Sequence, residues 1–359
     1  MNRRQMMAST LALTSASVLP NLSFAHSNSE VGTFSTSNVE RMFGSLEEGL
    51  FYSTGGQVRT RNSGVLSVAQ EKALISKVGP TNPQICLTSI TARMQSIFPA
   101  FRLLAFPYAF PYASDAHGFL QNENVRRNGY GCLIKRDGEF IPNALAKKTN
   151  ICVVAFGYAG PTGFLSTNSS YRSIDQIKTL ETPTVFSPRP NDELEEVYIK
   201  VGFKRFVRTV AEMKSAFADN TPNMFALLSA GLAYDLGNSR NSYSINSIRP
   251  VVYFASLPTD YVESFEQDVL ADIYETGYNL TFTNYIGFKA LQSRIFYNMS
   301  LKGMHINRDR QAKTIVQSIM ESVDVDVVSD IQEIGIADSL QGFFKWRDDS
   351  LLNPVFQRP

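Results

Sequence analysis

The sequence predicts an α/β protein with two lobes and a ligand cleft between them. Residues 151–156 form a short apolar, β-rich run and residues 183–186 form a second, so both are typical of buried strands. Glycines and a proline between positions 157 and 163 interrupt the first run and leave the backbone open beside small side chains. Residues 173–178 indicate a short helix. Because ligands usually bind between lobes, we expect residues 150–188 to form much of the cleft.

The first 25 residues have the pattern of a secretory signal peptide. Arg3 and Arg4 supply a charged start, residues 6–20 are mainly apolar but too short to span a bilayer, and Ser23-Phe24-Ala25 is a small-x-small cleavage pattern. The twin arginines suggest the folded-protein export route. The alternative is an ordinary amphipathic first helix. We expect cleavage after Ala25 and a soluble protein exported to the periplasm.

Charge and cysteine content narrow the class of partner. Removing Arg3 and Arg4 leaves 32 basic residues against 33 acidic ones, which argues against a nucleic-acid or anionic-membrane partner. The three cysteines are Cys86, Cys132 and Cys152. An oxidising compartment would allow Cys132 to pair with Cys152, but three buried free thiols fit the spacing equally well.

Before the central stretch, the pattern alternates between strands and helices. It predicts strands at 31–35, 57–61 and 85–87, and helices at 39–52, 67–77, 113–122 and 123–129. Residues 101–110 are dense in aromatics and punctuated by prolines, which is more typical of core than of a ligand wall. Residues 135–144 are too mixed to assign.

After the central stretch, helix signals dominate. The predicted helices are 192–201 (closed by Gly202), 211–219 (ending at Asn220), 258–279 and 286–301, and the predicted strands are 206–210 and 249–255. We expect the chain to cross between lobes both at the central glycines and near Arg249. The tail from 331 to 359 lacks a clear period, except for a short helix near 338–345.

The residues that catalysis or metal binding would require are missing. His26, His117 and His305 are far apart in sequence and none has a metal-ligand spacing, and His117 is expected to be a solvated residue. The chain contains no nucleophile elbow, phosphate-binding glycine loop or dinucleotide fingerprint. We therefore expect no enzyme activity, no cofactor and no metal.

Three segments resemble a known family. FRLLAFPYAF at 101–110 resembles an apolar run of that family ending in Leu-Pro-Phe-hydrophobic-Phe, and AEMKSAFADNTPN at 211–223 resembles its Glu-x-x-x-Ala-Leu helix and turn. SLKGMHI at 300–306 is similar to its late helix and Gly-hydrophobic turn. The order of segments over most of the mature chain resembles the solute-binding proteins of TRAP transporters, of the dicarboxylate-binding (DctP) type, as a divergent member.

The resemblance implies a periplasmic-binding-protein-like fold, with two α/β lobes around a ligand cleft, crossing strands and a long connecting helix. It implies a first lobe at 26–157 with about 249–285, a second at 158–248 with about 286–330, and a C-terminal tail at 331–359. It also implies a monomer that captures a small organic solute and delivers it to TRAP-type membrane permease subunits.

The resemblance also locates a candidate ligand site. The family uses an arginine on a second-lobe strand to pair with the ligand carboxylate, and Phe186 stands at that position, while Arg189 lies close enough to replace it. Two further polar family positions are occupied by Gly163 and Leu227. The candidate ligand-binding residues are Thr88, Tyr108, Tyr158, Thr162, Phe186, Arg189, Glu212 and Asn223.

These departures predict an unusual solute. Burying a carboxylate without a cation costs several kcal/mol, so the cleft favours a weakly charged or aromatic solute. Two alternatives remain at this stage. One is an adaptor or sensor-associated protein of the same fold that delivers no solute to a permease, and the other is an exported enzyme whose chemistry leaves no motif.

Overall fold

The computed structural model describes residues 87–91, 94–110, 113–160, 162–188, 193–246, 249–309, 311–312, 314–315 and 327–351, with the side chains of 87–90, 159–160, 193 and 289 excepted. The predicted signal peptide, the strands and helices predicted before residue 85, Cys86 and Arg189 lie outside these residues. Of the strand predicted at 85–87, only Leu87 is described, and it begins β1 (Leu87–Ile90).

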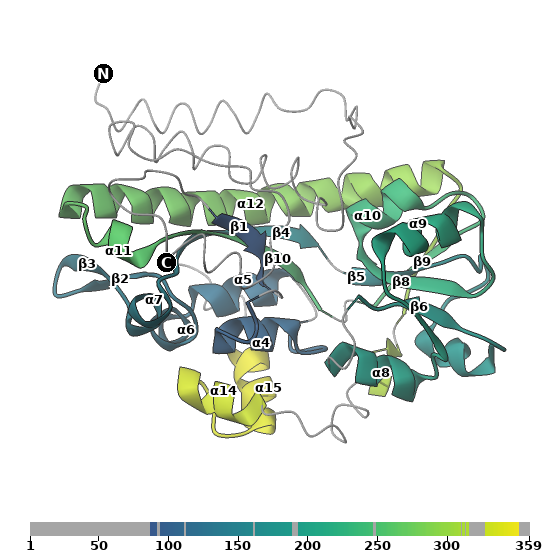
Figure 1. The fold of residues 1–359 in the computed structure, drawn as a ribbon, viewed down its shortest axis with the longest axis horizontal. Helices are drawn as coiled ribbons and strands as arrows, with labels where there is room; N and C mark the ends of the chain where they lie inside the picture. Colours follow the sequence, from purple (N-terminus) through teal and green to yellow (C-terminus); the bar gives the residue numbers. More distant parts are fainter. Residues whose placement is uncertain are drawn as a thin grey trace.

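The first lobe is built on a three-stranded antiparallel sheet of order β1-β10-β4 (Figure 1). Its strands are β1 (Leu87–Ile90), β4 (Cys152–Gly160) and β10 (Val251–Leu257). Around them lie α4 (Pro99–Ala105), α5 (Ala113–Gln121), α6 (Glu123–Asn128), α7 (Ala144–Thr149), α11 (Thr259–Val262) and the hairpin of β2 (Leu133–Arg136) and β3 (Glu139–Pro142). The hairpin occupies the stretch that the sequence left unassigned.

The second lobe is built on a six-stranded mixed sheet of order β11-β9-β5-β8-β6-β7. Its strands are β5 (Thr162–Ser166), β6 (Thr184–Phe186), β7 (Arg205–Val207), β8 (Met224–Ser229), β9 (Ser242–Ile245) and β11 (His305–Arg308). Its helices are the 3-10 helix η2 (Ile174–Thr179), α8 (Glu193–Val201), α9 (Val210–Ala218) and α10 (Ala230–Leu236). The sequence missed β8, α10 and β9.

Two strand crossings join the lobes. β4 runs from the first sheet almost directly into β5 of the second, and the chain returns from β9 to β10. The prediction that Gly157 ends the first strand is wrong, because Gly157 and Gly160 both pair with β10 and the strand continues to the crossing. The crossings themselves lie where the central glycines and Arg249 predicted them.

A single long helix spans both lobes. α12 (Gln267–Leu301) is 35 residues long and runs along the whole molecule in Figure 1. The sequence predicted two helices here, 258–279 and 286–301. The actual break falls earlier, between α11 and α12, and residues 280–285, which neither predicted helix included, are part of α12.

The C-terminal tail belongs to the core of the first lobe. α14 (Val327–Ile334) packs against α4 and α6, and α15 (Leu340–Ser350) follows it, both below the first lobe in Figure 1. Phe343 of α15 meets Phe110 edge to face, with ring centroids 5.7 Å apart. The prediction of a largely aperiodic tail is therefore wrong, since two helices cover one side of the lobe.

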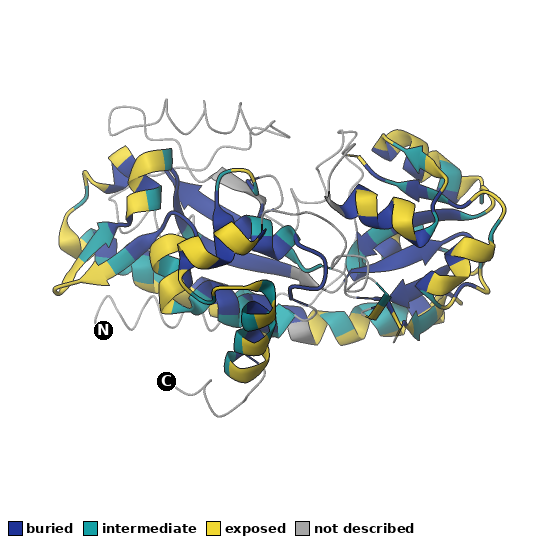
Figure 2. Cartoon of the chain, turned by 90° about the horizontal axis from the view of Figure 1, so that it is seen from below, coloured by how far each residue is buried: buried dark blue, intermediate teal, exposed yellow. Residues whose placement is uncertain are grey.

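Buried strands occupy the centre of each lobe, and exposed residues lie on the outer helices (Figure 2). The predicted core segment 101–110 is confirmed, with Phe101 packed among Phe98, Tyr130, Phe156 and Phe254. Within the described ranges, no helix is both long and apolar enough to cross a bilayer.

Candidate functional site

One edge of the six-stranded sheet faces the first lobe. The parallel strands β6, β7 and β8 end at this edge, and β9 and β11 end there too, because both run antiparallel to β5, whose first residue also lies there. Both strand crossings between the lobes also leave the sheet at this edge. We call it the interlobe edge. In open α/β sheets, ligands bind at the carboxyl ends of strands, so this edge is the candidate site.

Asn246, directly after β9, is the most unusual residue at the interlobe edge. Its side chain is buried, with 4% of the residue exposed, and neither its amide nitrogen nor its amide oxygen has a hydrogen-bond partner. Its backbone N–H donates to the Thr162 carbonyl at 3.3 Å. A buried amide without partners costs about 1–3 kcal/mol, which a ligand with a matching donor and acceptor would recover.

Tyr108 reaches the interlobe edge from the first lobe. Its hydroxyl donates to the Asn246 carbonyl at 2.6 Å, which ties the loop after α4 to the end of β9. Its backbone φ is 60°, a strained value for an aromatic residue. Burial, with a smaller contribution from Asp309, raises the pKa of Tyr108 far above its usual value, so the phenol stays a neutral donor.

Tyr171 and Asp309 lie close to Tyr108. The Tyr171 hydroxyl is buried and has no hydrogen-bond partner. Burial raises the pKa of Tyr171 well above its usual value, and the charge of Asp309 and the neighbouring Tyr108 add to this. A neutral phenol without a partner is a donor available to a ligand.

Asp309, just after β11, stabilises the fold at the same edge. Its carboxylate accepts hydrogen bonds from the Ser173 hydroxyl at 3.0 Å and the Ile174 N–H at 2.7 Å, which caps the 3-10 helix η2. It also accepts from the backbone N–H groups of Gln311 and Ala312. The carboxylate is thus fully hydrogen-bonded, and its negative charge disfavours an anionic ligand nearby.

Arg208, just after β7, brings a cation to the interlobe edge. Its guanidinium forms a two-point ion pair with the buried Glu195 of α8 and donates to the Ser187 carbonyl at 3.0 Å. The Ser187 hydroxyl also donates to Glu195, at 2.9 Å. Because Glu195 balances the charge of Arg208, this cluster adds polarity to the edge without a net positive charge.

Two predicted site residues sit at the interlobe edge besides Tyr108. The Thr162 hydroxyl donates to the Arg249 carbonyl at 2.9 Å and accepts from the Arg249 N–H, so it joins the two crossings. Phe186 ends β6, but its ring packs in the cluster that contains Val210 and Met213 of α9. Thr88 lies on β1, paired with Ala255.

Two further predicted site residues have other positions: Asn223 lies at the far end of the sheet, and Glu212 caps a helix. Asn223 precedes β8 at its amino end, on the opposite side of the sheet, with a φ of 55°. Glu212 is exposed and closes a capping box with Thr209 at the start of α9, accepting from its N–H at 3.1 Å.

Tyr158 on β4 and His117 on α5 form a pair inside the first lobe. The Tyr158 hydroxyl lies 3.0 Å from His117 Nδ1, and the His117 ring stacks on Tyr285 of α12 with centroids 4.5 Å apart. The prediction that His117 is solvated is therefore wrong. The helix that carries His117, α5, packs onto β4 and α12. The His117 ring therefore lies between the rings of Tyr158 and Tyr285.

Cys132 and Cys152 are both buried free thiols. Of the two alternatives, a disulfide between them or free thiols, the structure shows free thiols at these two positions. Burial raises the pKa of both. Within the described residues, no group of three histidine, cysteine or acidic side chains is arranged to hold a metal ion.

Asn246, Tyr171 and Arg208 were not found by sequence reasoning. Arg208 follows directly on the apolar strand β7, a signal that sequence alone could have used. The sequence around Asn246 and Tyr171 offers no comparable sign.

No family model matches the chain, and no curated protein matches it in sequence. Solved structures do match. A TRAP periplasmic solute-binding protein from Rhodobacter sphaeroides has a TM-score of 0.63 at 12% identity, over 88% of this chain and 95% of that one. DctP7 of Bordetella pertussis, an extracytoplasmic solute receptor binding pyroglutamic acid, has a TM-score of 0.62 at 12% identity, over 86% and 95%.

A third solved structure is a TRAP periplasmic solute-binding protein from Roseobacter denitrificans with bound β-D-glucuronate. It has a TM-score of 0.63 at 13% identity, over 85% of this chain and 93% of that one. These neighbours are binding proteins, and their fold matches the mixed α/β fold of this chain over most of its length. The chain therefore has the fold of the TRAP periplasmic solute-binding proteins.

Proposed function

We propose that the protein is a periplasmic solute-binding protein that captures a small organic solute at the interlobe edge and delivers it to a TRAP-type membrane permease. The observation that carries this proposal is the buried side chain of Asn246, which has no hydrogen-bond partner among the described residues and lies at the kind of sheet edge where open α/β sheets bind ligands. Tyr171 supports it with a second buried polar group that lacks a partner. The fold supports it through neighbours that bind glucuronate and pyroglutamic acid.

The described groups without hydrogen-bond partners at the interlobe edge favour a neutral or weakly charged solute, and the cations Arg249 and Arg308 lie at the same edge. Asp309 is negative, and the Arg208–Glu195 pair is balanced. Tyr108 and Tyr171 remain neutral phenols. The groups that lack partners are one amide and one hydroxyl, which match a hydroxyl, amide or lactam on the solute better than a carboxylate.

The test is a thermal-shift screen of the full chain against a panel of neutral polyols, amides, lactams and organic acids. A compound that binds only the folded protein raises its stability by RT ln(1 + [L]/Kd). We expect the neutral polar compounds to give the largest shifts. A panel in which simple dicarboxylates such as succinate give the largest shift, and lose it in Asn246→Ala, would contradict the proposed solute class. If no compound gives a shift that depends on Asn246, the adaptor is favoured.

Tyr171→Phe is predicted to have opposite effects on stability and on solute binding. Removing a buried hydroxyl without a partner should leave the unliganded protein equally or slightly more stable, whereas a solute that accepts from this hydroxyl should bind about tenfold more weakly. Urea unfolding and calorimetry with the best compound of the screen measure the two effects.

Tyr243→Phe is the matched control for Tyr171→Phe. The Tyr243 hydroxyl is also buried but donates to the Leu228 carbonyl at 3.0 Å. Its removal should cost about 1 kcal/mol of stability without changing solute affinity. Equal losses of affinity in both variants would place the solute away from Tyr171.

A further inference from the structure

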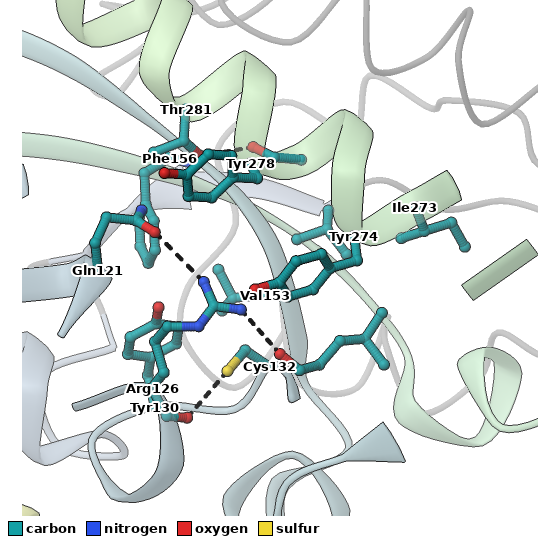
Figure 3. A pocket seen from close by; sticks show the side chains of 13 residues that line it. Gln121, Arg126, Tyr130, Cys132, Val153, Phe156, Ile273, Tyr274, Tyr278 and Thr281 are labelled. Carbon is teal, nitrogen blue, oxygen red and sulfur yellow. Dashed lines mark hydrogen bonds between the residues drawn. The ribbon is translucent and has the colours of Figure 1, made fainter. Parts of the chain in front are cut away.

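A pocket in the first lobe lies apart from the interlobe edge. It is enclosed by the N-terminal half of α12, β4 and α6, and the space between its side chains is about 380 Å³, including the part open to solvent. Figure 3 shows the guanidinium of Arg126 at its centre, with Gln121 on one side and Tyr274 on the other. The proposed solute site contributes none of these residues.

Arg126 is a cation without a carboxylate partner among the described residues. Its Nη2 donates to the Leu133 carbonyl at 3.0 Å and its Nη1 to the Gln121 amide oxygen at 3.5 Å, and its guanidinium lies 5.0 Å from the centre of the Tyr274 ring. A guanidinium has five N–H donors and stays protonated in proteins. The guanidinium has further N–H donors beyond these two bonds, and within the pocket they can bond to water or to an anion that enters it.

The acidic groups nearest to Arg126 do not neutralise it. Burial raises the pKa of the Cys132 thiol to about 12, and that thiol donates to the Arg126 carbonyl at 3.0 Å. The Tyr130 hydroxyl is also neutral, because burial raises its pKa, and it donates to the Leu120 carbonyl at 2.8 Å. Neither group supplies the counter-charge.

The surroundings of Arg126 suit a small planar anion. The guanidinium fork matches the two oxygens of a carboxylate, and the amide of Gln121 lines the same pocket. The Thr281 hydroxyl also lines it but already donates to the Gly277 carbonyl. Tyr278 is half-exposed and lines the pocket, so the pocket opens to solvent beside Tyr278. We propose that this pocket binds a small carboxylate anion on Arg126, which stabilises the packing of α12 on the first lobe.

The test uses acetate as the probe, with sodium chloride at equal ionic strength as the reference. We expect acetate to raise the unfolding temperature of the full chain in a saturable way, with half of the effect in the millimolar range, beyond any change caused by chloride. A shift no larger than that of chloride would overturn the proposal.

Arg126→Met retains the length of the side chain and removes its charge. This variant should lose the acetate response, and Arg126→Lys, which retains the charge without the fork, should need about tenfold more acetate. If Arg126→Met does not fold, the lysine variant alone decides. An unchanged acetate response in Arg126→Lys would contradict a site built on the guanidinium fork.

Arg127→Met is the matched control on the same helix. Arg127 is exposed and pairs with Glu123 one turn away, so its removal should leave the acetate response intact. Asn246→Ala should also leave it intact, which separates this pocket from the proposed solute site. Loss of the response in Asn246→Ala would place acetate at the interlobe edge and overturn the assignment to Arg126.

Discussion

Gly277→Ala is expected to destabilise the first lobe by about 3 kcal/mol, because overpacking of this kind costs 1–3 kcal/mol or more. A Cβ atom on Gly277 would lie 1.9 Å from the Val154 carbonyl oxygen of β4. The clash is with backbone, so no side-chain rotation relieves it, and α12 would have to move away from β4.

That movement would also break the hydrogen bonds that hold α12 on β4. The Phe156 N–H donates to the Thr281 hydroxyl at 2.9 Å, and the Asn284 amide donates to the Phe156 carbonyl at 3.0 Å. These side chains satisfy the backbone of β4 on the edge that β10 does not cover. Losing them leaves buried backbone groups without partners, which adds to the cost of the clash.

Urea unfolding followed by fluorescence of Trp346, the only tryptophan, measures this effect, because Trp346 packs on Phe119 in the first lobe. Gly287→Ala is the control on the same helix. A Cβ there meets nothing within 4 Å, so alanine should stabilise the helix by about 0.5–1 kcal/mol. If Gly277→Ala proved as stabilising as Gly287→Ala, α12 would not lie so close to β4.

The sequence predicted the elements whose signals are local. α8 ends at Gly202, whose φ is 114°, and α9 ends near Asn220, whose φ is 53°, as their positions after apolar helical patterns indicated. The aromatic run at 101–110 was predicted as core because side chains of that size are seldom left exposed in such density, and the structure confirms it.

Elements that depend on distant partners were missed. β9 has the sequence Ser-Tyr-Ser-Ile, and it is buried because its serines bond to carbonyls of Asn168 and Arg172, about 70 positions away in the chain. The continuity of α12 was missed at residues 280–285, which are rich in threonine and aromatic residues and so favour a helix only weakly. They remain helical because Leu280, Thr281 and Tyr285 are buried, which the sequence alone does not show.

The candidate site was the hardest part to predict. Asn246 and Tyr108 are 138 positions apart and meet only because the crossings bring β9 to the loop after α4. An asparagine side chain without partners has no sequence signature, since the same residue in a turn would be solvated. Tyr108 and Thr162 were predicted as an aromatic residue and a small hydroxyl that could line the cleft, and the structure places both at the interlobe edge.

Arg347→Met is expected to destabilise the protein by about 3 kcal/mol and to weaken solute binding. The Arg347 side chain is 2% exposed, and its Nη1 donates to the carbonyls of Tyr108 and Ala109 at 3.0 Å each. Removing it leaves two buried acceptors without a partner, at about 1–3 kcal/mol each. The same bonds hold Tyr108 at its positive φ, so the loop should relax away from the Asn246 carbonyl.

Asp348→Ala is the control, because it removes the ion-pair partner of Arg347 but none of the bonds to the loop. Because Arg347 is buried, this change leaves its guanidinium without this counter-charge and should cost about 1–3 kcal/mol, but it should leave solute affinity unchanged. Arg347→Lys should fall between the two, since an ammonium group lacks the rigid fork that serves two carbonyls. Urea unfolding and calorimetry with the compound found in the screen measure both effects. If Arg347→Met and Asp348→Ala prove equally mild, the tail helix α15 does not position Tyr108, and the strained loop must be held by the packing of Phe110 on Phe119 and Phe343 instead.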